Sequence, residues 1–282
     1  MKSAAKPLRP STPVHYVSYQ PLQMKLIFCH LLEGDGTWSD KELTAPFWRL
    51  YWNPTPGARV RLGDQCIDLI PSTVALVAPY TSYTKEADCW VEHFHMHFFA
   101  GTIFNTIRNA MFAFAVTDRI REELEEVIAL LYRDQVEDLH FLIRANGILF
   151  WALTQLSAVI PSPPRLNPRI QEICSYLDQH FMLEISNDSL AARLSMNTNA
   201  FIGSFKKATG LTPRQYILRK RIEEACALLQ FSDKSIDTIA DDVGFCSRDY
   251  FTRIFSNFMG MGPGIYRKTR LGGGLGDSRV AY

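Results

Sequence analysis

Two segments of the chain, FKKATGLTPRQY at residues 205–216 and FSNFMGMGPGIY at residues 255–266, share four residues at one constant offset. Glycine commonly ends a helix because it adopts the left-handed conformation, and proline suits the first turn of the next helix. The sequence therefore predicts the same helix exit twice, with a basic first copy and an uncharged second copy. The shared pairs are Phe205/Phe255, Gly210/Gly260, Pro213/Pro263 and Tyr216/Tyr266.

Each exit follows two short helical segments separated by a turn. Leu190-Ala191 in the first unit and Ile239-Ala240 in the second are 49 residues apart, so the second unit has one extra residue near its turn. Between the units, a segment of about 17 residues predicts a helix roughly 25 Å long. The back part is thus two helix-turn-helix units joined by one long helix. The expected helices are 168–181, 186–195, 199–209, 213–231, 236–243 and 247–258.

The front part of the chain is predicted to be rich in β-strands. Aromatic and β-branched residues fill short segments separated by turn residues, which is typical of an antiparallel barrel or sandwich. Two segments with helical spacing follow, and their surplus apolar residues favour packing on the barrel and on a second copy of the chain. The expected strands are 46–53, 58–62, 65–70, 73–79 and 89–99, and the expected helices are 118–135 and 138–160.

Charge and cysteine content exclude few classes of function. The net charge is +1, but residues 193–221 hold seven basic residues and no acidic ones, which is either a phosphate footprint or a solvated helix face. The six cysteines form no CxxC pair, so neither a disulfide framework nor a metal site is expected. Apolar runs are short and the first residues have no apolar core, so we expect no membrane helix and no secretory signal.

The repeat resembles the DNA-binding domain of the AraC/XylS family of bacterial transcription regulators, over roughly residues 170–270. The front part is more loosely similar to that family's sensor, a cupin-like β-barrel followed by a helical dimerisation segment. It departs from the family at Ser72-Thr73, where Gly-Asp is common, and at Tyr80, where Gly is common. The resemblance is most specific at Ile239, Ala240, Val243, Gly244, Phe245, Tyr250, Phe251, Arg253, Phe255, Gly260, Pro263, Tyr266 and Arg267.

The resemblance implies that the second helix of each unit enters the major groove of double-stranded promoter DNA. Arg253 matches a family position that often contacts DNA, although it could instead pair with Asp249 on a solvated face. In the first unit Gly203 stands where family members often carry Arg, so Lys206 and Lys207 are expected to anchor phosphates while the second unit reads bases. The predicted DNA-binding residues are Thr198, Asn199, Ile202, Lys206, Lys207, Arg248, Asp249, Thr252 and Arg253.

Polar and aromatic residues on two expected strands are candidates for binding a small effector. In one strand three alternating histidines share a face, and in sugar-responsive members of the family the corresponding strand lines the pocket. In the other, two tryptophans share one face and three polar residues share the other, and the sequence leaves open which face points inward. Aromatic rings with fixed polar groups suit a sugar. The predicted effector-binding residues are Trp48, Arg49, Tyr51, Asn53, His93 and His95.

We therefore predict an α+β protein of two domains that acts as a cytoplasmic transcription regulator, an activator controlled by a small molecule. The partners would be promoter DNA, a second copy, an effector such as a sugar and, for an activator, RNA polymerase, with no membrane, no cofactor and no enzymatic activity. The alternatives are a repressor, a regulator without effector, and a metal-dependent cupin enzyme fused to a DNA-binding domain. The expected parts are a cupin-like β-barrel at 1–117, a dimerisation helix pair at 118–160, a linker at 161–167, a double helix-turn-helix domain at 168–270 and a flexible tail at 271–282.

Overall fold

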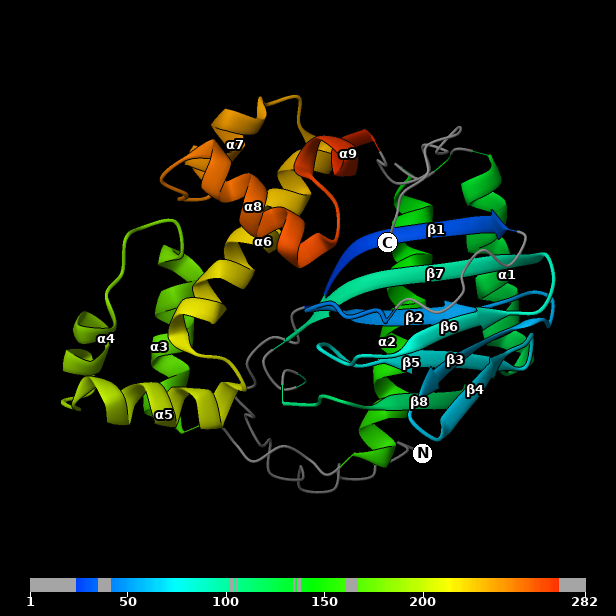
Figure 1. Cartoon of the computed structure of the whole chain (residues 1–282), viewed down its shortest axis with the longest axis horizontal. Helices are drawn as coiled ribbons and strands as arrows, with labels where there is room; N and C mark the ends of the chain where they lie inside the picture. Colours follow the sequence, from blue (N-terminus) through cyan, green and yellow to red (C-terminus); the bar gives the residue numbers. More distant parts are fainter. Residues whose placement is uncertain are drawn as a thin grey trace, which may run out of the picture.

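The computed structural model describes residues 24–34, 42–101, 104, 106–133, 135, 138–160 and 167–268. Antiparallel β-sheets form the first part of the described chain and helices form the second (Figure 1). This arrangement confirms the predicted α+β fold class. Most of the predicted linker at 161–167 and all of the predicted tail at 271–282 lie outside the described residues.

The strands form two antiparallel sheets that share an apolar core between them. The larger sheet has the order β1-β7-β2-β5-β8, and the smaller has the order β4-β3-β6. The five expected strands are present, but β1, β6 and β8 escaped prediction because none of them alternates cleanly between apolar and polar residues. The bounds are β1 (Met24–Gly34), β2 (Trp48–Trp52), β3 (Ala58–Leu62), β4 (Gln65–Leu69), β5 (Thr73–Val77), β6 (Thr84–Ala87), β7 (Val91–Ala100) and β8 (Met111–Ala115).

The larger sheet has two differently packed faces, because successive residues of a strand point to opposite sides. Trp48 and Trp52 of β2 point to one face, where they share an apolar core with α1 (Asp118–Tyr132) and α2 (Leu139–Val159). Tyr51 points to the other face and shares a core with the smaller sheet. The helical pair thus packs on the β-sheets as expected, and its pairing with a second copy stays a prediction.

Among the described residues, α2 is a helix long and apolar enough to cross a membrane by length and composition, which the sequence reading did not expect. One of its faces is buried against the larger sheet, whereas Leu139, Ile143 and Phe150 are exposed on another. Packing of one apolar face on a sheet accounts for much of its hydrophobicity. The buried residues are Phe141, Ala145, Ile148, Leu149, Ala152, Leu153 and Leu156.

The two helix-turn-helix units lie at the two ends of α6 (Pro213–Phe231), whose 19 residues correspond to a length of about 28 Å (Figure 1). Tyr216 in its first half packs in the core of the first unit, and Leu229 in its second half packs in the core of the second. The predicted helices are present, and one more follows them. The bounds of the others are α3 (Pro168–His180), α4 (Asn187–Arg193), α5 (Thr198–Thr209), α7 (Ile236–Asp242), α8 (Arg248–Met259) and α9 (Pro263–Lys268).

One guanidinium on α6 ties the two units together. Arg221 donates from Nε to the carbonyl of Phe181 at 2.8 Å and from Nη2 to that of Leu183 at 2.9 Å. Its Nη1 donates to the carbonyl of Gly244 in the turn of the second unit. The three acceptors come from the connection between α3 and α4 and from the turn between α7 and α8, so a single side chain fixes their relative position.

We expect Gly244→Ala to destabilise the protein by about 1–3 kcal/mol. Gly244 has a φ of +87°, and a Cβ there would lie 2.2 Å from the carbonyl oxygen of Met182, which is backbone and cannot move aside cheaply. Gly203→Ala is the control, because its Cβ would meet open space in mid-helix and add up to about 1 kcal/mol of stability. Urea unfolding of both variants measures the difference, and equal midpoints for Gly244→Ala and the parent chain would contradict the close approach.

Candidate DNA-binding surface and effector site

The two helix-turn-helix units match down to the ends of their helices. Ser186 and Ser235 accept hydrogen bonds from backbone N–H groups and so begin the first helix of each unit. Gly210 and Gly260 end the second helices with φ values of +75° and +74°. This left-handed conformation is nearly free of strain only for glycine, which explains why the sequence repeats this residue.

The turns show where the second unit gains its extra residue. Ser195 and Gly244, 49 residues apart, both have positive φ, at +52° and +87°. Asn197 and Ser247, 50 residues apart, both cap the helix that follows. The additional residue of the second unit therefore lies between Gly244 and Ser247, in the turn itself.

The second helix of each unit buries one face and exposes the other. Phe201 and Phe205 of α5 are buried at positions equivalent to Phe251 and Phe255 of α8. The predicted DNA-binding residues lie on the opposite, accessible faces, as recognition helices require. Asn199, Lys206, Lys207, Arg248, Asp249 and Arg253 are exposed, and Thr198, Ile202 and Thr252 are half-buried.

Two of these nine residues bind an acidic partner within their own unit. The hydroxyl of Thr198 donates to the carboxylate of Asp188. At the equivalent position of the second unit, Arg248 Nη1 donates to Asp237 Oδ2 at 3.1 Å. Both bonds hold the short first helix against the start of the second helix, so Thr198 and Arg248 have a structural role besides any contact with DNA.

Arg253 is an exposed arginine on α8, and the other exposed arginine of that helix, Arg248, is bound to Asp237. Its guanidinium lies 5.4 Å from the centre of the Tyr250 ring. Among the described residues no ion pair joins it to Asp249, so the alternative considered from the sequence is absent there. Gly203 occupies the equivalent position on α5 and offers no side chain. The two surfaces therefore differ in hydrogen-bonding capacity, as the sequence indicated.

Only part of the basic run at residues 193–221 faces solvent, because its last three members contribute to the fold. Arg219 forms an ion pair with Glu223 at 2.8 Å, and Lys220 forms one with Asp178 at 3.0 Å. Arg221 binds three carbonyls. Reading the whole run as one phosphate footprint is thus wrong at these positions.

Five of the six predicted effector residues lie together on the face of the larger sheet that points toward the smaller one. The pairing of β2 with β7 places Arg49 beside His97 and Tyr51 beside His95. His93 Nδ1 donates to Asn53 Oδ1 at 2.9 Å. All five residues are buried. The sequence left open which face of the strand at residues 46–53 points toward the pocket, and the face that points toward the smaller sheet is the polar one.

Trp48 is the exception among the predicted effector residues. It is fully buried on the opposite face of the sheet, where it packs in the core formed with the helices. Its ring stacks on Phe98 with centroids 6.4 Å apart. Because alternation along β2 separates it from the other five residues, Trp48 does not belong to this cluster.

The cluster contains polar residues that the sequence reading missed. Tyr83 accepts a hydrogen bond from Arg49 Nη1 at 3.1 Å and hydrogen-bonds the hydroxyl of Tyr51. The ammonium of Lys85 lies 5.4 Å from the centre of the Tyr51 ring. Tyr83 and Lys85 lie just before and within β6, the charged strand that gave no alternating signal, so nothing in the sequence placed them inside.

Burial and mutual repulsion lower the pKa of Lys85 and of the three histidines beside it. Desolvation, with the charge of Arg49 adding to it, lowers the pKa of Lys85 to about 7. Desolvation also lowers the pKa of His93, His95 and His97 well below the usual range, and nearby cations contribute. Near neutral pH the three imidazoles are therefore uncharged, and Arg49 is the permanent charge among them.

Comparison with known proteins bears mainly on the back part of the chain. Residues 190–269 match the family model described as a helix-turn-helix domain. The back part of the chain thus carries an AraC-type helix-turn-helix domain. The MmsAB operon regulatory protein of Pseudomonas aeruginosa is 32% identical over 153 residues, which cover 52% of this chain and 46% of that protein. The HTH-type transcriptional activator RhaS of Klebsiella pneumoniae is 27% identical, over 55% of this chain and 57% of the relative.

The chain spans about half the length of these two curated relatives. A solved structure of wild-type ToxT from Vibrio cholerae, with unsaturated fatty acid bound, is similar over 89% of this chain and 96% of its own. Its TM-score is 0.55 at 14% sequence identity. That likeness shows the fold alone, which combines a β-sheet part with a helical part.

The AraC-type domain packs against the β-sheets through α6 and α9. Gln230 Nε2 and the Tyr266 hydroxyl both donate to the carbonyl of Ile27, at 2.6 and 2.7 Å. The register of β1 against β7 shifts between Leu26 and Phe28, and a bulge leaves the backbone of its extra residue out of the ladder. The bulge at Ile27 thus supplies the acceptor that docks the second helix-turn-helix unit.

A second set of contacts joins the sheets to the first half of the AraC-type domain. Arg219 Nη2 donates to the carbonyl of Ala100 at 2.7 Å, and its guanidinium lies 4.8 Å from the centre of the Phe99 ring. Arg108 Nη2 donates to the carbonyl of Gly210 at 2.6 Å and stacks on Tyr80. Tyr80, which stands where the family commonly has Gly, adopts a positive φ of +57°.

We expect the protein to lose stability steadily as the pH falls from 8.5 to 5.5. The unfolded chain protonates Lys85 at its ordinary pKa near 10.5, whereas the folded chain does so only near 7. The unfolded state therefore binds more protons in this window, and stability rises with pH. Below about 6.5 the histidines with lowered pKa values act in the same direction.

The urea midpoint measured across this range tests the expectation. Lys85→Met should flatten the dependence above pH 7 and leave the fall below 6.5 in place. If the urea midpoint is equal at pH 8.5 and 5.5, the pKa values of Lys85 and the histidines are not lowered in the folded chain, and the expectation is wrong.

Proposed function

We propose that the chain is a sequence-specific DNA-binding transcription regulator controlled by a small molecule. One observation supports this above the others: α5 and α8 present equivalent exposed faces at the two ends of α6. Successive major grooves on one face of DNA lie about 34 Å apart, and α6 is about 28 Å long. One chain would then insert one helix into each of two neighbouring grooves. The relatives' names, a transcriptional activator and an operon regulatory protein, support the same function.

Helices α5 and α8 would make different kinds of contact with DNA. Arg253 on α8 carries a planar fork of donors that matches guanine O6 and N7 in the major groove. Gly203 leaves α5 without that reach, so base contacts there fall to Asn199 and Ile202. Lys206 and Lys207 are exposed on α5 and would bind phosphates, which position the protein without reading sequence.

Arg253→Ala should weaken binding to the preferred DNA site by about 1–3 kcal/mol and relax selectivity at one or two base pairs, because a bidentate contact is lost.

Lys206→Ala combined with Lys207→Ala should instead weaken binding to every DNA sequence. It should reduce the slope of log affinity against log salt concentration by up to about two. Selection of sites from a random DNA pool, followed by anisotropy titrations at several salt concentrations, measures both effects.

Gly203→Ala is the matched control for these variants, because it adds a methyl group at the position equivalent to Arg253. It should leave the selected motif unchanged. If Gly203→Ala rewrites the motif and Arg253→Ala does not, the roles of the two helices are reversed. If the parent chain selects no motif at all, the proposed function is wrong.

The effector would bind on the side of the β-sheets that carries Arg49, Tyr51, Asn53, His93 and His95. These residues form a buried polar cluster, and a polar cluster inside a core is retained most readily where a ligand uses it. The bound molecule in the ToxT structure supports the idea that a protein of this architecture takes a small ligand. A sugar, as favoured from the sequence, is one candidate class.

The alternatives differ in regulation and chemistry. A metal-dependent enzyme would need converging ligands, and the described residues contain no group of three or more His, Cys, Asp or Glu side chains placed for a metal. We therefore propose a regulator that is not an enzyme. The name of RhaS favours an activator, which would contact RNA polymerase, over a repressor. Binding to a bacterial promoter would take place in the cytoplasm.

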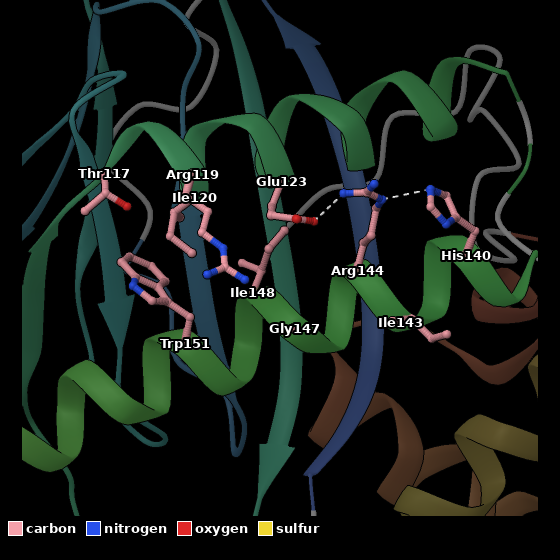
Figure 2. A pocket seen from close by; sticks show the side chains of 10 residues that line it. All are labelled: Thr117, Arg119, Ile120, Glu123, His140, Ile143, Arg144, Gly147, Ile148 and Trp151. Carbon is pink, nitrogen blue, oxygen red and sulfur yellow. Dashed lines mark hydrogen bonds and ion pairs between the residues drawn. The ribbon is translucent and has the colours of Figure 1, made fainter.

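The groove between α1 and α2 would receive a second copy of the chain. Its volume is about 560 Å³ (Figure 2). Arg144 lies within it and donates to Glu123 at 2.6 Å and to His140 at 2.8 Å. Along its edge runs an exposed apolar stripe on α2: Leu139 is 68% exposed, Ile143 is 62% and Phe150 is 45%. Such a stripe beside a groove is typical of an interface between proteins.

The spacing of this stripe suits a two-fold axis. Gly147 is exposed, and a Cβ built on it would meet no atom within 4 Å, so another helix can approach closely there. Ile143 lies four residues before Gly147 and Phe150 three residues after it. An antiparallel pair of α2 helices that cross at Gly147 would thus set Ile143 of each chain against Phe150 of the other, as an isologous interface requires.

Ile143→Lys combined with Phe150→Lys sets like charges against each other across this interface and should convert a dimer into a monomer in sedimentation velocity of the full chain. Charges buried at the centre of such an interface should cost about 2 kcal/mol or more, which is roughly 30-fold in the dissociation constant. Phe231→Lys changes an aromatic residue on α6 that is 61% exposed and should leave the dimer intact. A parent chain that sediments as a monomer at high concentration would contradict the interface.

A further inference from the structure

The side chain of Arg214 reaches from the first helix-turn-helix unit to the second. Arg214 lies in the first turn of α6, directly after the exit from α5, and Tyr250 lies in the first turn of α8. Nη2 of Arg214 donates to the hydroxyl of Tyr250 at 3.4 Å, across 36 positions of the chain. The contact therefore lies at the junction of the two units, between the helices that carry the predicted DNA-binding residues.

Tyr250 is held in one orientation by the core of the second unit. It is half-buried, and its ring packs edge-on against Phe245 with the ring centres 5.7 Å apart. The guanidinium of Arg253 lies 5.4 Å from the centre of the same ring. One aromatic side chain thus contacts two guanidiniums, that of Arg253 at its ring and that of Arg214 at its hydroxyl.

The guanidinium of Arg214 is exposed and has donors to spare. Its bond to Tyr250 is longer than the roughly 2.9–3.0 Å typical of N–H···O bonds, and it uses one of the several N–H groups of the fork. Within the described residues no ion pair joins Arg214 or Arg253 to an acidic side chain. Two cations beside one ring produce a local positive potential that an anion would neutralise.

The hydroxyl of Tyr250 complements Arg214 as a second donor. A tyrosine hydroxyl that accepts a hydrogen bond still has its own O–H to donate. The O–H and the guanidinium lie side by side, because they are joined by the bond between them. Such a pair of donors suits an anion with several acceptor oxygens, and a phosphate group is one.

The pair has no equivalent at the matching positions of the repeat. Ala200 on α5 corresponds to Tyr250, and Gly264 on α9 corresponds to Arg214. Neither residue has a side-chain donor. Because each unit forms the same helices around a similar aromatic core, folding of a unit does not require the pair, and its place at the junction points to a role outside folding.

We propose that Arg214 and Tyr250 together bind one phosphate group of the DNA backbone, in the stretch between the base pairs contacted by α5 and those contacted by α8. The inference rests on the proposed DNA-binding function and adds a contact to it. Arg214 supplies the charge and Tyr250 supplies a second hydrogen bond. A phosphate contact positions a protein on DNA without reading sequence, so the pair would fix the placement of both units on the site.

DNA in which single phosphates are replaced by uncharged methylphosphonates tests the contact. The DNA is the motif that the parent chain selects from a random pool. The parent chain should lose about 10-fold in affinity when one phosphate between the two groups of selected base pairs is replaced. Arg214→Ala should bind the unmodified motif about 10-fold more weakly, and the same replacement should then cost less than about 2-fold, because the contact is already absent.

Two further variants separate this contact from a general loss of charge or of packing. Tyr250→Phe keeps the ring beside Arg253 and removes the hydroxyl, so it should weaken binding about 3-fold or more and leave the selected motif unchanged. Arg133→Ala removes an exposed arginine at the end of α1 and should bind like the parent chain. Arg214→Ala should reduce the slope of log affinity against log salt concentration by about one, whereas Arg133→Ala should leave that slope unchanged.

The proposal is overturned if Arg214→Ala keeps the salt dependence of the parent chain, or if it remains sensitive to every phosphate to which the parent is sensitive. Tyr250→Phe with the affinity of the parent would remove the hydroxyl from the contact and overturn the paired site. A changed base preference between the two groups of base pairs in Arg214→Ala would show that this arginine reads the minor groove, which also contradicts the phosphate contact.

These outcomes are distinct from those for the proposed function. A parent chain that selects a motif, with variants that show none of these effects, disproves the phosphate contact alone. A parent chain that selects no motif disproves the DNA-binding function and this contact with it.

Discussion

Helix α6 is the element on which both DNA-binding units and their link to the β-sheets depend. Tyr216 in its first half belongs to the core of the first unit, and Leu229 in its second half to the core of the second. Between them Arg219 binds the β-sheets and Arg221 binds carbonyls of both units. Because a helix is stiff, a constraint on any of these contacts acts on the spacing of α5 and α8.

Much of the helical part could be predicted from the sequence because its determinants are local. Gly210 and Gly260 end helices through a backbone conformation that other residues adopt only with strain, and Pro213 and Pro263 begin the next ones. These glycines and prolines determine the local backbone within a few residues, and they have the same effect in the folded chain. The unequal offset between the two units likewise located an extra residue, which the structure places before Ser247.

The sheet part was less predictable because its determinants are distant pairings. Alternation showed that Trp48 and Arg49 point to opposite faces, but only the packing of α1 and α2 on one face decides which is the polar interior. The role of the Ile27 carbonyl depends on a register shift in the pairing of β1 with β7, next to the pair formed by Phe28 and His97, which is 69 residues later in the chain. No local pattern in the sequence indicates that shift. Arg219 and Arg221 carry the charge of a phosphate-binding residue, and only burial shows that they bind carbonyls instead.

The repeated helix exit also supplies contacts between the β-sheets and the helix-turn-helix domain. The carbonyl of Gly210 at the end of α5 accepts a hydrogen bond from Arg108, and Tyr266 after the end of α8 donates to the carbonyl of Ile27. Both recognition helices are therefore held at their C-terminal ends, while their exposed faces remain accessible. A molecule that tightens or loosens either contact shifts the population of spacings between the two helices. In the proposed regulator, the two helices would enter neighbouring grooves of fixed separation, so that shift would change DNA affinity without any contact between the ligand and the DNA-binding face.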